Sequence, residues 1–321
     1  MRQPHYRTRR QTPVCNMAFF HLLNCLTFSV VLVANSEGEN AAMSSHHNSF
    51  PDLEYVEIDG AKLYLDLFVP EKVKQPPLTV YIHGGGWRSG DRKGTLEKNE
   101  FLEPLLGAGY AVASIDYRLS STAVFPAQIH DCKAAVRWLR AYADEYGFDA
   151  SRVAAMGTSA GGHLAVLMGV TADVEELEGH LGKNVTESSA VQAIVDFFGP
   201  ADFLLRSRTQ AGKCNQPEGP VYQLLGGSVR KNTDLAKLAS PVRHVDAGDP
   251  PLFIVHGLMD GKVNPGQSIE LYQAYRKHNL PVEITLLPDG GHGGPEFKKL
   301  EITAKVIRFL NKHLKNSSGT P

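Results

Sequence analysis

The segment VAAMGTSAGGHLA, at residues 153–165, constrains the fold of this chain more than any other stretch. A strand-like apolar run enters GTSAG, in which Gly157 and Gly161 flank Ser159, and a helix-like run follows. A serine in so sharp a strand-to-helix turn tolerates no bulky neighbours, because the two backbones nearly touch. The turn raises the hydroxyl above the sheet edge, and the helix directs its N-terminal N–H groups toward it. We therefore predict that Ser159 is a nucleophile.

Strand and helix signals alternate along the rest of the chain. Strand-like runs lie at residues 53–58, 62–69, 78–82, 110–115, 153–156, 193–198, 252–256 and 282–287. Apolar residues recur with helical spacing at 96–108, 127–146, 160–171, 265–279 and 295–314. The Asp59–Gly60 pair is typical of a hairpin turn, and Gly147 is typical of a helix end. A hairpin followed by strand–helix–strand units predicts an α/β fold, with a mostly parallel eight-stranded sheet and helices on both faces.

Residues 199–250 interrupt this alternation. The segment is rich in glycine, proline and charge, and only 220–225 and 233–239 have short helical patterns. A long irregular insertion in a compact domain often shapes a binding site. We expect a small cap or lid here, and a mobile surface excursion is the alternative.

The nucleophile requires a base to take its proton and an acid to orient that base. In this architecture the two partners follow the serine in the order acid, then histidine, after later strands. Asp260 lies in the loop after the apolar run PLFIVH, and His292 lies among glycines at the exit of the last strand. We predict Asp260 as the acid and His292 as the base. Asp202, which follows the preceding strand, is the alternative acid, and Asp289 is expected to shape the final turn.

The segment YIHGGGWRSGD follows the third strand and supplies candidate oxyanion donors. Successive glycines allow backbone N–H groups to face inward without a Cβ in the way. We assign Gly85 and Gly86 as donors, completed by the N–H of Ala160. A tight structural turn or a phosphate loop is the alternative, but the sequence lacks GxGxxG and an ending in GK[ST].

Four other residues have weaker assignments. Trp87 and His163 are candidate pocket residues, with packing and support of the site as their alternative roles. Cys132 and Cys214 imply no disulfide framework, although a disulfide between them is an alternative.

No CxxC or HExxH spacing occurs, so we predict neither a metal nor a cofactor. With 33 basic and 34 acidic residues, the chain lacks the basic character of a nucleic-acid binder.

The motifs HGGGW, DYRLS, FPAQIHDCKAAVRWLR, GTSAGGHLA, HGLMD and GGHG together resemble the α/β-hydrolase superfamily. The resemblance covers about residues 52–314 and is nearest to the hormone-sensitive-lipase-like esterases, closest to a bacterial feruloyl- or acetyl-xylan-esterase-like branch. Thr158 departs from the Asp or Glu that hormone-sensitive-lipase-like enzymes usually carry, and their long N-terminal helical cap has no counterpart. Both departures favour the small-cap carbohydrate-esterase branch.

The resemblance implies a serine carboxylic-ester hydrolase that forms an acyl-enzyme and needs no cofactor. By motif, Ser159, Asp260 and His292 match the catalytic triad of this superfamily, and the glycine turn matches its oxyanion loop. The expected substrates are small acyl esters, such as acetyl or feruloyl groups on plant or algal polysaccharide. The alternative activity is that of a promiscuous short-chain carboxylesterase or lipase.

Two further alternatives are less favoured. A serine exopeptidase of the prolyl-oligopeptidase type normally carries an additional propeller domain, which this sequence lacks. A non-catalytic binding protein on the same fold would be expected to lack one of the three residues. A lipase is also disfavoured, because the insertion offers no clearly amphipathic helix as a lipid-facing lid.

The N-terminus has the pattern of a cleavable secretory signal. Arginines precede an apolar stretch at 17–34 that ends in small residues. An uncleaved anchor, or a translation start at Met17, is the alternative. We expect an exported protein without a membrane-spanning domain after signal removal. The expected parts are a signal peptide at 1–36, a linker at 37–51, an α/β-hydrolase domain at 52–315 and a tail at 316–321.

Overall fold

The computed structural model describes residues 46–94 and 101–315. The predicted signal peptide, the first nine residues of the predicted linker and the tail lie outside the described residues. The helix expected from residue 96 also begins outside them.

The core of the fold is one eight-stranded sheet in the order β1-β2-β4-β3-β5-β6-β7-β8. Strand β2 is antiparallel to both β1 and β4, and all other neighbours are parallel. The strands are β1 (His47–Ile58), β2 (Ala61–Pro70), β3 (Pro77–Ile82), β4 (Ala111–Ile115), β5 (Asp149–Thr158), β6 (Ala193–Phe197), β7 (Leu252–Gly257) and β8 (Val282–Leu287). The predicted α/β-hydrolase architecture is confirmed.

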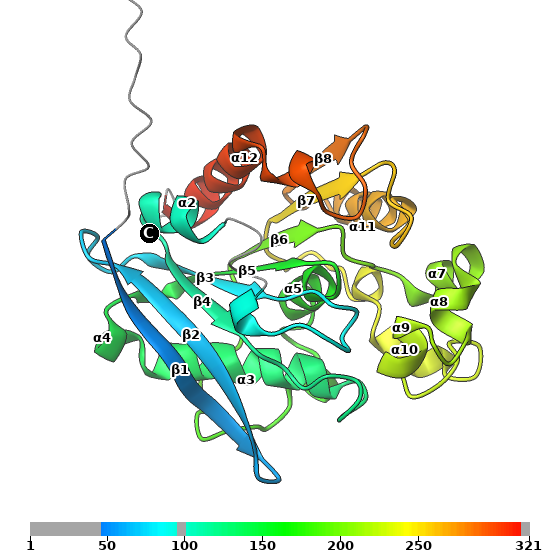
Figure 1. The fold of residues 1–321 in the computed structure, drawn as a ribbon, viewed down its shortest axis with the longest axis horizontal. Helices are drawn as coiled ribbons and strands as arrows, with labels where there is room; N and C mark the ends of the chain where they lie inside the picture. The colour runs from blue at the N-terminus through cyan, green and yellow to red at the C-terminus, as the bar shows by residue number, and fades with distance from the viewer. Residues whose placement is uncertain (1–45, 95–100, 316–321) are drawn as a thin grey trace, which may run out of the picture. The chain divides into compact units, whose positions relative to one another are not determined.

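Helices cover both faces of this sheet (Figure 1). They are α2 (Leu102–Gly107), α3 (Ala127–Ala141), α4 (Ala143–Tyr146), α5 (Ala160–Val170), α6 (Glu175–Glu178), α7 (Phe203–Thr209), α8 (Ala211–Asn215), α9 (Pro220–Leu224), α10 (Thr233–Leu238), α11 (Gly266–Lys277) and α12 (Leu300–Leu310). Short 3₁₀ turns lie at η1 (Pro241–Arg243) and η2 (Pro295–Lys298), and a π turn, η3 (Asn311–Lys315), follows α12.

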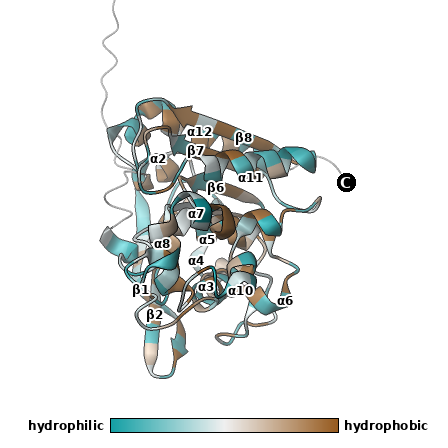
Figure 2. Cartoon of the chain, turned by 90° about the vertical axis from the view of Figure 1, so that its right-hand side faces the viewer, coloured by the Kyte–Doolittle hydropathy of each residue, from teal (hydrophilic) through white to brown (hydrophobic). Residues whose placement is uncertain are grey.

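Alternate residues of the central strands face two separate cores, because successive side chains of a strand point to opposite faces. Val153 and Ala155 of β5 belong to the core that α3, α5 and α11 cover. Ala154 and Met156 belong to the core that α2 and α12 cover. Figure 2 shows the hydrophobic residues concentrated in the strands and in α5, behind the partly hydrophilic helices of the insertion. Burial on both faces explains why these strands are continuous apolar runs in the sequence.

The structure corrects several predicted boundaries. Strand β1 begins at His47, so residues 47–50 of the predicted linker pair with β2. The predicted insertion at 199–250 contains four short helices, α7 to α10, of which only the last two had a recognisable pattern in the sequence.

Gly147 adopts a left-handed conformation with a φ of 81° at the end of α4, as predicted for a helix end. Cys132 and Cys214 are both buried and free.

Candidate active site

The turn between β5 and α5 is built around glycines. Ser159 has a φ of 56°, a strained value for a residue with a side chain. A Cβ on Gly157 would lie 2.3 Å from the Gly161 carbonyl, and one on Gly161 would lie 2.0 Å from the carbonyl oxygen of Ile82. Only glycine fits at either position. The strand and the helix can therefore approach closely enough to present the Ser159 hydroxyl to solvent above the sheet.

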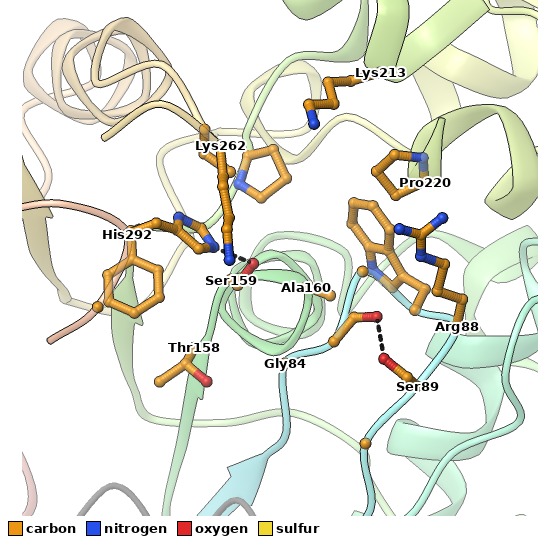
Figure 3. Close-up of a pocket in the computed structure, with 18 of the residues that line it drawn as sticks. Gly84, Arg88, Ser89, Thr158, Ser159, Ala160, Lys213, Pro220, Lys262 and His292 are labelled. Carbon is orange, nitrogen blue, oxygen red and sulfur yellow. Dashed lines mark hydrogen bonds between the residues drawn. The ribbon is translucent and has the colours of Figure 1, made fainter. Parts of the chain in front are cut away.

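The structure brings Ser159, His292 and Asp260 together. They follow the carboxyl ends of β5, β8 and β7, which lie at one edge of the sheet because the strands are parallel. The Nε2 of His292 lies 2.9 Å from the Ser159 hydroxyl (Figure 3). Its Nδ1 lies 2.6 Å from a carboxylate oxygen of Asp260. A carboxylate only accepts, so Nδ1 donates to Asp260 and leaves Nε2 to accept the serine proton.

Asp260 is held by donors on both of its carboxylate oxygens. The N–H groups of Lys262 and Val263 donate to Oδ1, at 2.7 and 2.9 Å. His256 lies with its Nε2 3.2 Å from Oδ2. Burial disfavours the charged carboxylate, but the hydrogen bonds of His256, His292 and the Val263 N–H outweigh burial and hold the pKa of Asp260 well below its usual value.

A second hydrogen-bonded pair lies behind Asp260. His256 is fully buried, and its Nδ1 lies 2.6 Å from the hydroxyl of Ser268 on α11. Its Nε2 also lies 3.1 Å from the carbonyl oxygen of Val263. Because the Nε2 faces only acceptors, it carries the proton, and Nδ1 accepts from Ser268. The chain of polar contacts therefore extends from Ser159 through His292, Asp260 and His256 to Ser268.

Asp202, the alternative acid, has a structural role in the insertion. Asp202 caps the N-terminus of α7 by accepting from the N–H groups of Leu204 and Leu205. Its second oxygen forms an ion pair with Arg243 at 2.7 Å. Both carboxylate oxygens of Asp202 are thus engaged within the insertion, whereas Asp260 is the carboxylate that His292 contacts.

The predicted oxyanion donors border the same pocket as Ser159. Gly85 and Gly86 have positive φ values of 107° and 64°, and Ala160 is the first residue of α5. The carbonyl of Gly85 is occupied by the Ser89 hydroxyl, at 3.0 Å (Figure 3). Within residues 46–94 and 101–315, the N–H groups of Gly85, Gly86 and Ala160 have no hydrogen-bond acceptor. They are free to bind a negatively charged oxygen beside Ser159.

Residues 65–275 match the model of the BD-FAE family, which is well over half of the chain. The chain belongs to the BD-FAE family. Esterase LipC of Mycobacterium tuberculosis (strain ATCC 25618 / H37Rv) is 30% identical over 222 residues, which are 68% of this chain and 53% of LipC. The chain spans about half the length of the curated relatives that it matches.

Two solved structures resemble this member of the BD-FAE family closely. One is described as a truncated form of carbohydrate esterase from gut microbiota, with a TM-score of 0.77 and 30% identity over 85% of this chain and 98% of that one. The other is a bifunctional GH43-CE of Bacteroides eggerthii, with a TM-score of 0.75 and 32% identity over 83% of this chain and 38% of that one. Both likenesses agree with an α/β-hydrolase fold in this family member.

The two candidate pocket residues of this BD-FAE chain differ in their roles. Trp87 is almost fully buried, yet borders the pocket. The prediction that His163 lines the pocket is wrong. Its Nδ1 accepts from the Trp87 indole N–H at 3.3 Å, and its Nε2 lies 2.7 Å from the Ala239 carbonyl. His163 is fully buried, and burial lowers its pKa to about 4. It therefore fixes Trp87 against the insertion as a neutral side chain.

Sequence reasoning missed a buried carboxylate next to this site. Asp196 of β6 is fully buried and accepts from the N–H of Gly199 at 2.9 Å. Its second oxygen has no hydrogen-bond partner within the described part of the chain. Burial raises the pKa of Asp196 to about 6, although the Gly199 N–H opposes this shift. The sequence offered no signal, because Asp196 stands inside an apolar strand pattern.

The described residues contain no group of three or more His, Cys, Asp or Glu side chains arranged to hold a metal ion. Among the same residues, no helix is both long and apolar enough to cross a bilayer.

Proposed function

We propose that this chain is a carboxylic-ester hydrolase in which Ser159 is the nucleophile, His292 the general base and Asp260 the acid that orients it. The observation that carries the proposal is the continuous set of contacts from the Ser159 hydroxyl to Asp260, at 2.9 and 2.6 Å. The strained serine turn and the free N–H groups beside it add support, since both serve acyl transfer.

The reaction proceeds through an acyl-enzyme. Ser159 attacks the ester carbonyl while His292 takes its proton, and the Asp260 carboxylate stabilises the resulting imidazolium. The N–H groups of Gly85, Gly86 and Ala160 bind the oxyanion. His292 returns the proton to the leaving alcohol, and a water that His292 activates then hydrolyses the acyl-enzyme and releases the acid.

The proposed substrates are small acyl esters, with an acetyl or feruloyl group on a saccharide. The similar gut-microbiota structure is described as a carbohydrate esterase, which supports a saccharide as the alcohol. The pocket has a volume of about 790 Å³, and glycines and polar or charged side chains interrupt its apolar lining. A long alkyl chain would require a continuous apolar groove, so this lining favours a short acyl group over a lipid.

The test is hydrolysis of p-nitrophenyl acetate to decanoate, methyl ferulate and acetylated xylan by the wild type and Ser159→Ala. We expect turnover of acetate and acetylated xylan, and a loss of about 10⁴-fold or more in the variant. The matched control is Ser151→Ala, an exposed serine on the same strand, which should retain wild-type turnover. Rates that rise with acyl-chain length would point to a lipase. The absence of turnover of every ester by both proteins would overturn the proposal.

We also propose that the protein is exported. The arginine-rich start and apolar stretch within residues 1–36 support this proposal. Fractionation of expressing cells, with N-terminal sequencing of the product, tests it. A mature N-terminus near residue 36 outside the cytoplasm is expected, and a full-length cytoplasmic product would contradict export.

A further inference from the structure

The pocket beside Ser159 has a one-sided charge. Its lining within the described residues includes four cationic side chains and no Asp or Glu. The four are Arg88, Arg206, Lys213 and Lys262. They come from three separate parts of the chain: the glycine loop, helices α7 and α8 of the insertion, and the loop that carries Asp260. The chain as a whole has a net charge of −1, so this concentration of positive charge is local.

These cations differ from the basic residues that are buried or half-buried elsewhere in the molecule. Lys133 and Arg137 form ion pairs with Glu178, and Arg118 pairs with Asp131. Among the described residues, none of the four pocket cations has a carboxylate partner. Protein interiors normally pair a buried charge such as Arg206, because unpaired burial is costly, whereas Arg88, Lys213 and Lys262 are exposed to solvent. The pocket therefore has positive charge available for a ligand.

Arg206 gives the strongest support for a bound anion in this pocket. Its side chain is only 3% exposed, yet it borders the pocket. One of its amino groups donates to the carbonyl oxygen of Lys262 at 2.9 Å, and its Nε has no partner within the described chain. Burial lowers the pKa of Arg206, while electrostatic interactions with Cys214 and Asp260 oppose the shift. A bound anion would reduce this cost.

The position of the exposed cations indicates which part of the substrate they meet. In Figure 3, Lys262 points toward Ser159 and His292, while Lys213 and Arg88 lie on the side of Pro220. On that side the pocket adjoins a hollow of about 430 Å³, which shares Arg88, Lys213 and Pro220 with it and is also lined by Glu218. A small acyl group needs little room, so the larger alcohol part lies toward this hollow.

We propose that the substrate is an acyl ester of an anionic saccharide, whose carboxylate or sulfate group lies against Lys213, Arg88 and Lys262. This inference rests on the proposed function and specifies its substrate class. Arg206 contributes buried positive charge behind them and holds the backbone of the Lys262 loop. A neutral saccharide ester would leave all four charges without a counterion.

The test compares three acetyl esters that differ in one group. They are a mono-O-acetylated methyl galacturonide, the corresponding neutral galactoside, and the same galactoside with a 6-sulfate. We measure kcat/KM for acetate release at low salt and at about 1 M NaCl. We expect one or both anionic esters to exceed the neutral one by about tenfold or more at low salt. High salt should reduce this ratio to below about threefold, because it screens exposed charges.

Variants assign the effect to the pocket. Lys213→Gln and Lys262→Gln should each lower the anionic-to-neutral ratio about fourfold, as expected for one charge about 5 Å away in water. The matched control is Lys231→Gln, an exposed lysine of the same insertion outside the pocket lining, which should leave the ratio unchanged. Since the ratio is measured on one preparation, a loss of folded protein does not alter it.

The outcomes separate this inference from the proposed function. Equal rates for all three esters, abolished by Ser159→Ala, would overturn the anionic substrate and leave the esterase intact. A preference that survives high salt and both lysine variants would also overturn it. A faster carboxylate ester supports an acidic sugar, and a faster sulfate ester supports a sulfated one. If no ester, including p-nitrophenyl acetate, released acetate, the proposed ester hydrolase function itself would be overturned.

Discussion

Asp260 and Asp196 are buried carboxylates associated with neighbouring strands, β7 and β6, yet their surroundings have opposite effects. Asp260 contacts two histidines and accepts from two backbone N–H groups, and its pKa is lowered. Asp196 accepts from one backbone N–H, has one oxygen without a partner among the described residues, and its pKa is raised to about 6. The number of hydrogen-bond donors, and not burial itself, therefore decides whether a buried carboxylate stays charged.

The largest expected effect comes from removing the charge that the donors stabilise. Asp260→Asn should lower kcat for p-nitrophenyl acetate about 10³- to 10⁴-fold at pH 7, because an amide no longer stabilises the His292 imidazolium or its correct tautomer. Steady-state kinetics measure this loss. The matched control is Asp144→Asn, an exposed position on α4, which should retain wild-type kcat. A fall of less than tenfold for Asp260→Asn would contradict the role of this carboxylate.

The next effect concerns stability and belongs to Asp196. Its pKa of about 6 in the folded state exceeds the ordinary 3.8, so the folded state retains a proton that the unfolded state releases between these pH values. Stability from this group therefore falls as the pH rises from 4 to 6, by roughly 3 kcal/mol in total. Asp196→Asn removes this dependence.

Urea unfolding at several pH values measures the difference between wild type and Asp196→Asn. The free energy of unfolding of the variant, relative to wild type, should increase by roughly 3 kcal/mol between pH 4 and pH 8. A difference that is constant with pH would show that Asp196 is already charged in the folded protein.

A smaller effect is expected from His256, a positioning residue that contacts Asp260 and whose electrostatic influence also reaches Asp196. His256→Phe removes one donor from Asp260 and should lower kcat about tenfold, with KM changed less than about twofold. His256→Gln retains a side-chain donor and should recover most of the activity. Equal losses in both variants, in parallel with lower melting temperatures, would indicate a role in packing alone.

The smallest effect is expected one contact further away. Ser268→Ala removes the hydroxyl that fixes the ring of His256 and should lower kcat about threefold, without changing KM. The same kinetic assay measures it, and Ser268→Thr, which keeps a hydroxyl, is its control. A loss larger than that of His256→Phe would contradict the order of the contacts.

The sequence was informative where the physical cause of structure is local. Continuous apolar runs predicted the parallel strands, since burial on both faces removes polar alternation. The glycines of GTSAG predicted the serine turn, because a Cβ at either flanking position has no room. Asp260 and His292 could be predicted because parallel strands bring their carboxyl ends to the same edge of a sheet.

The sequence was less informative where contacts depend on tertiary packing. His256 stands in an apolar run, so nothing in the pattern distinguished a residue that contacts Asp260 from a buried strand residue. His163 was assigned to the pocket, whereas Trp87 and the Ala239 carbonyl occupy its two nitrogens. Helices α7 and α8, of seven and five residues, had no recognisable helical pattern, although α9 and α10, which have five and six residues, did. Strand β1 begins with largely exposed residues at the sheet edge, so its start lacked an apolar signal.

The strand order has a consequence for how the protein can be divided. The proposed nucleophile follows β5, whereas the proposed acid and base follow β7 and β8. An exposed stretch at residues 185–188 separates the two groups in the chain. A cut in this stretch would give one fragment with the serine and another with its proton-transfer partners. Their interface would include the β5–β6 ladder, which joins Ala154–Thr158 to Ala193–Phe197, and both hydrophobic cores, which contain residues from each fragment. Ester hydrolysis would then require reassembly of the two fragments, so the fold provides a complementation reporter with a chromogenic readout.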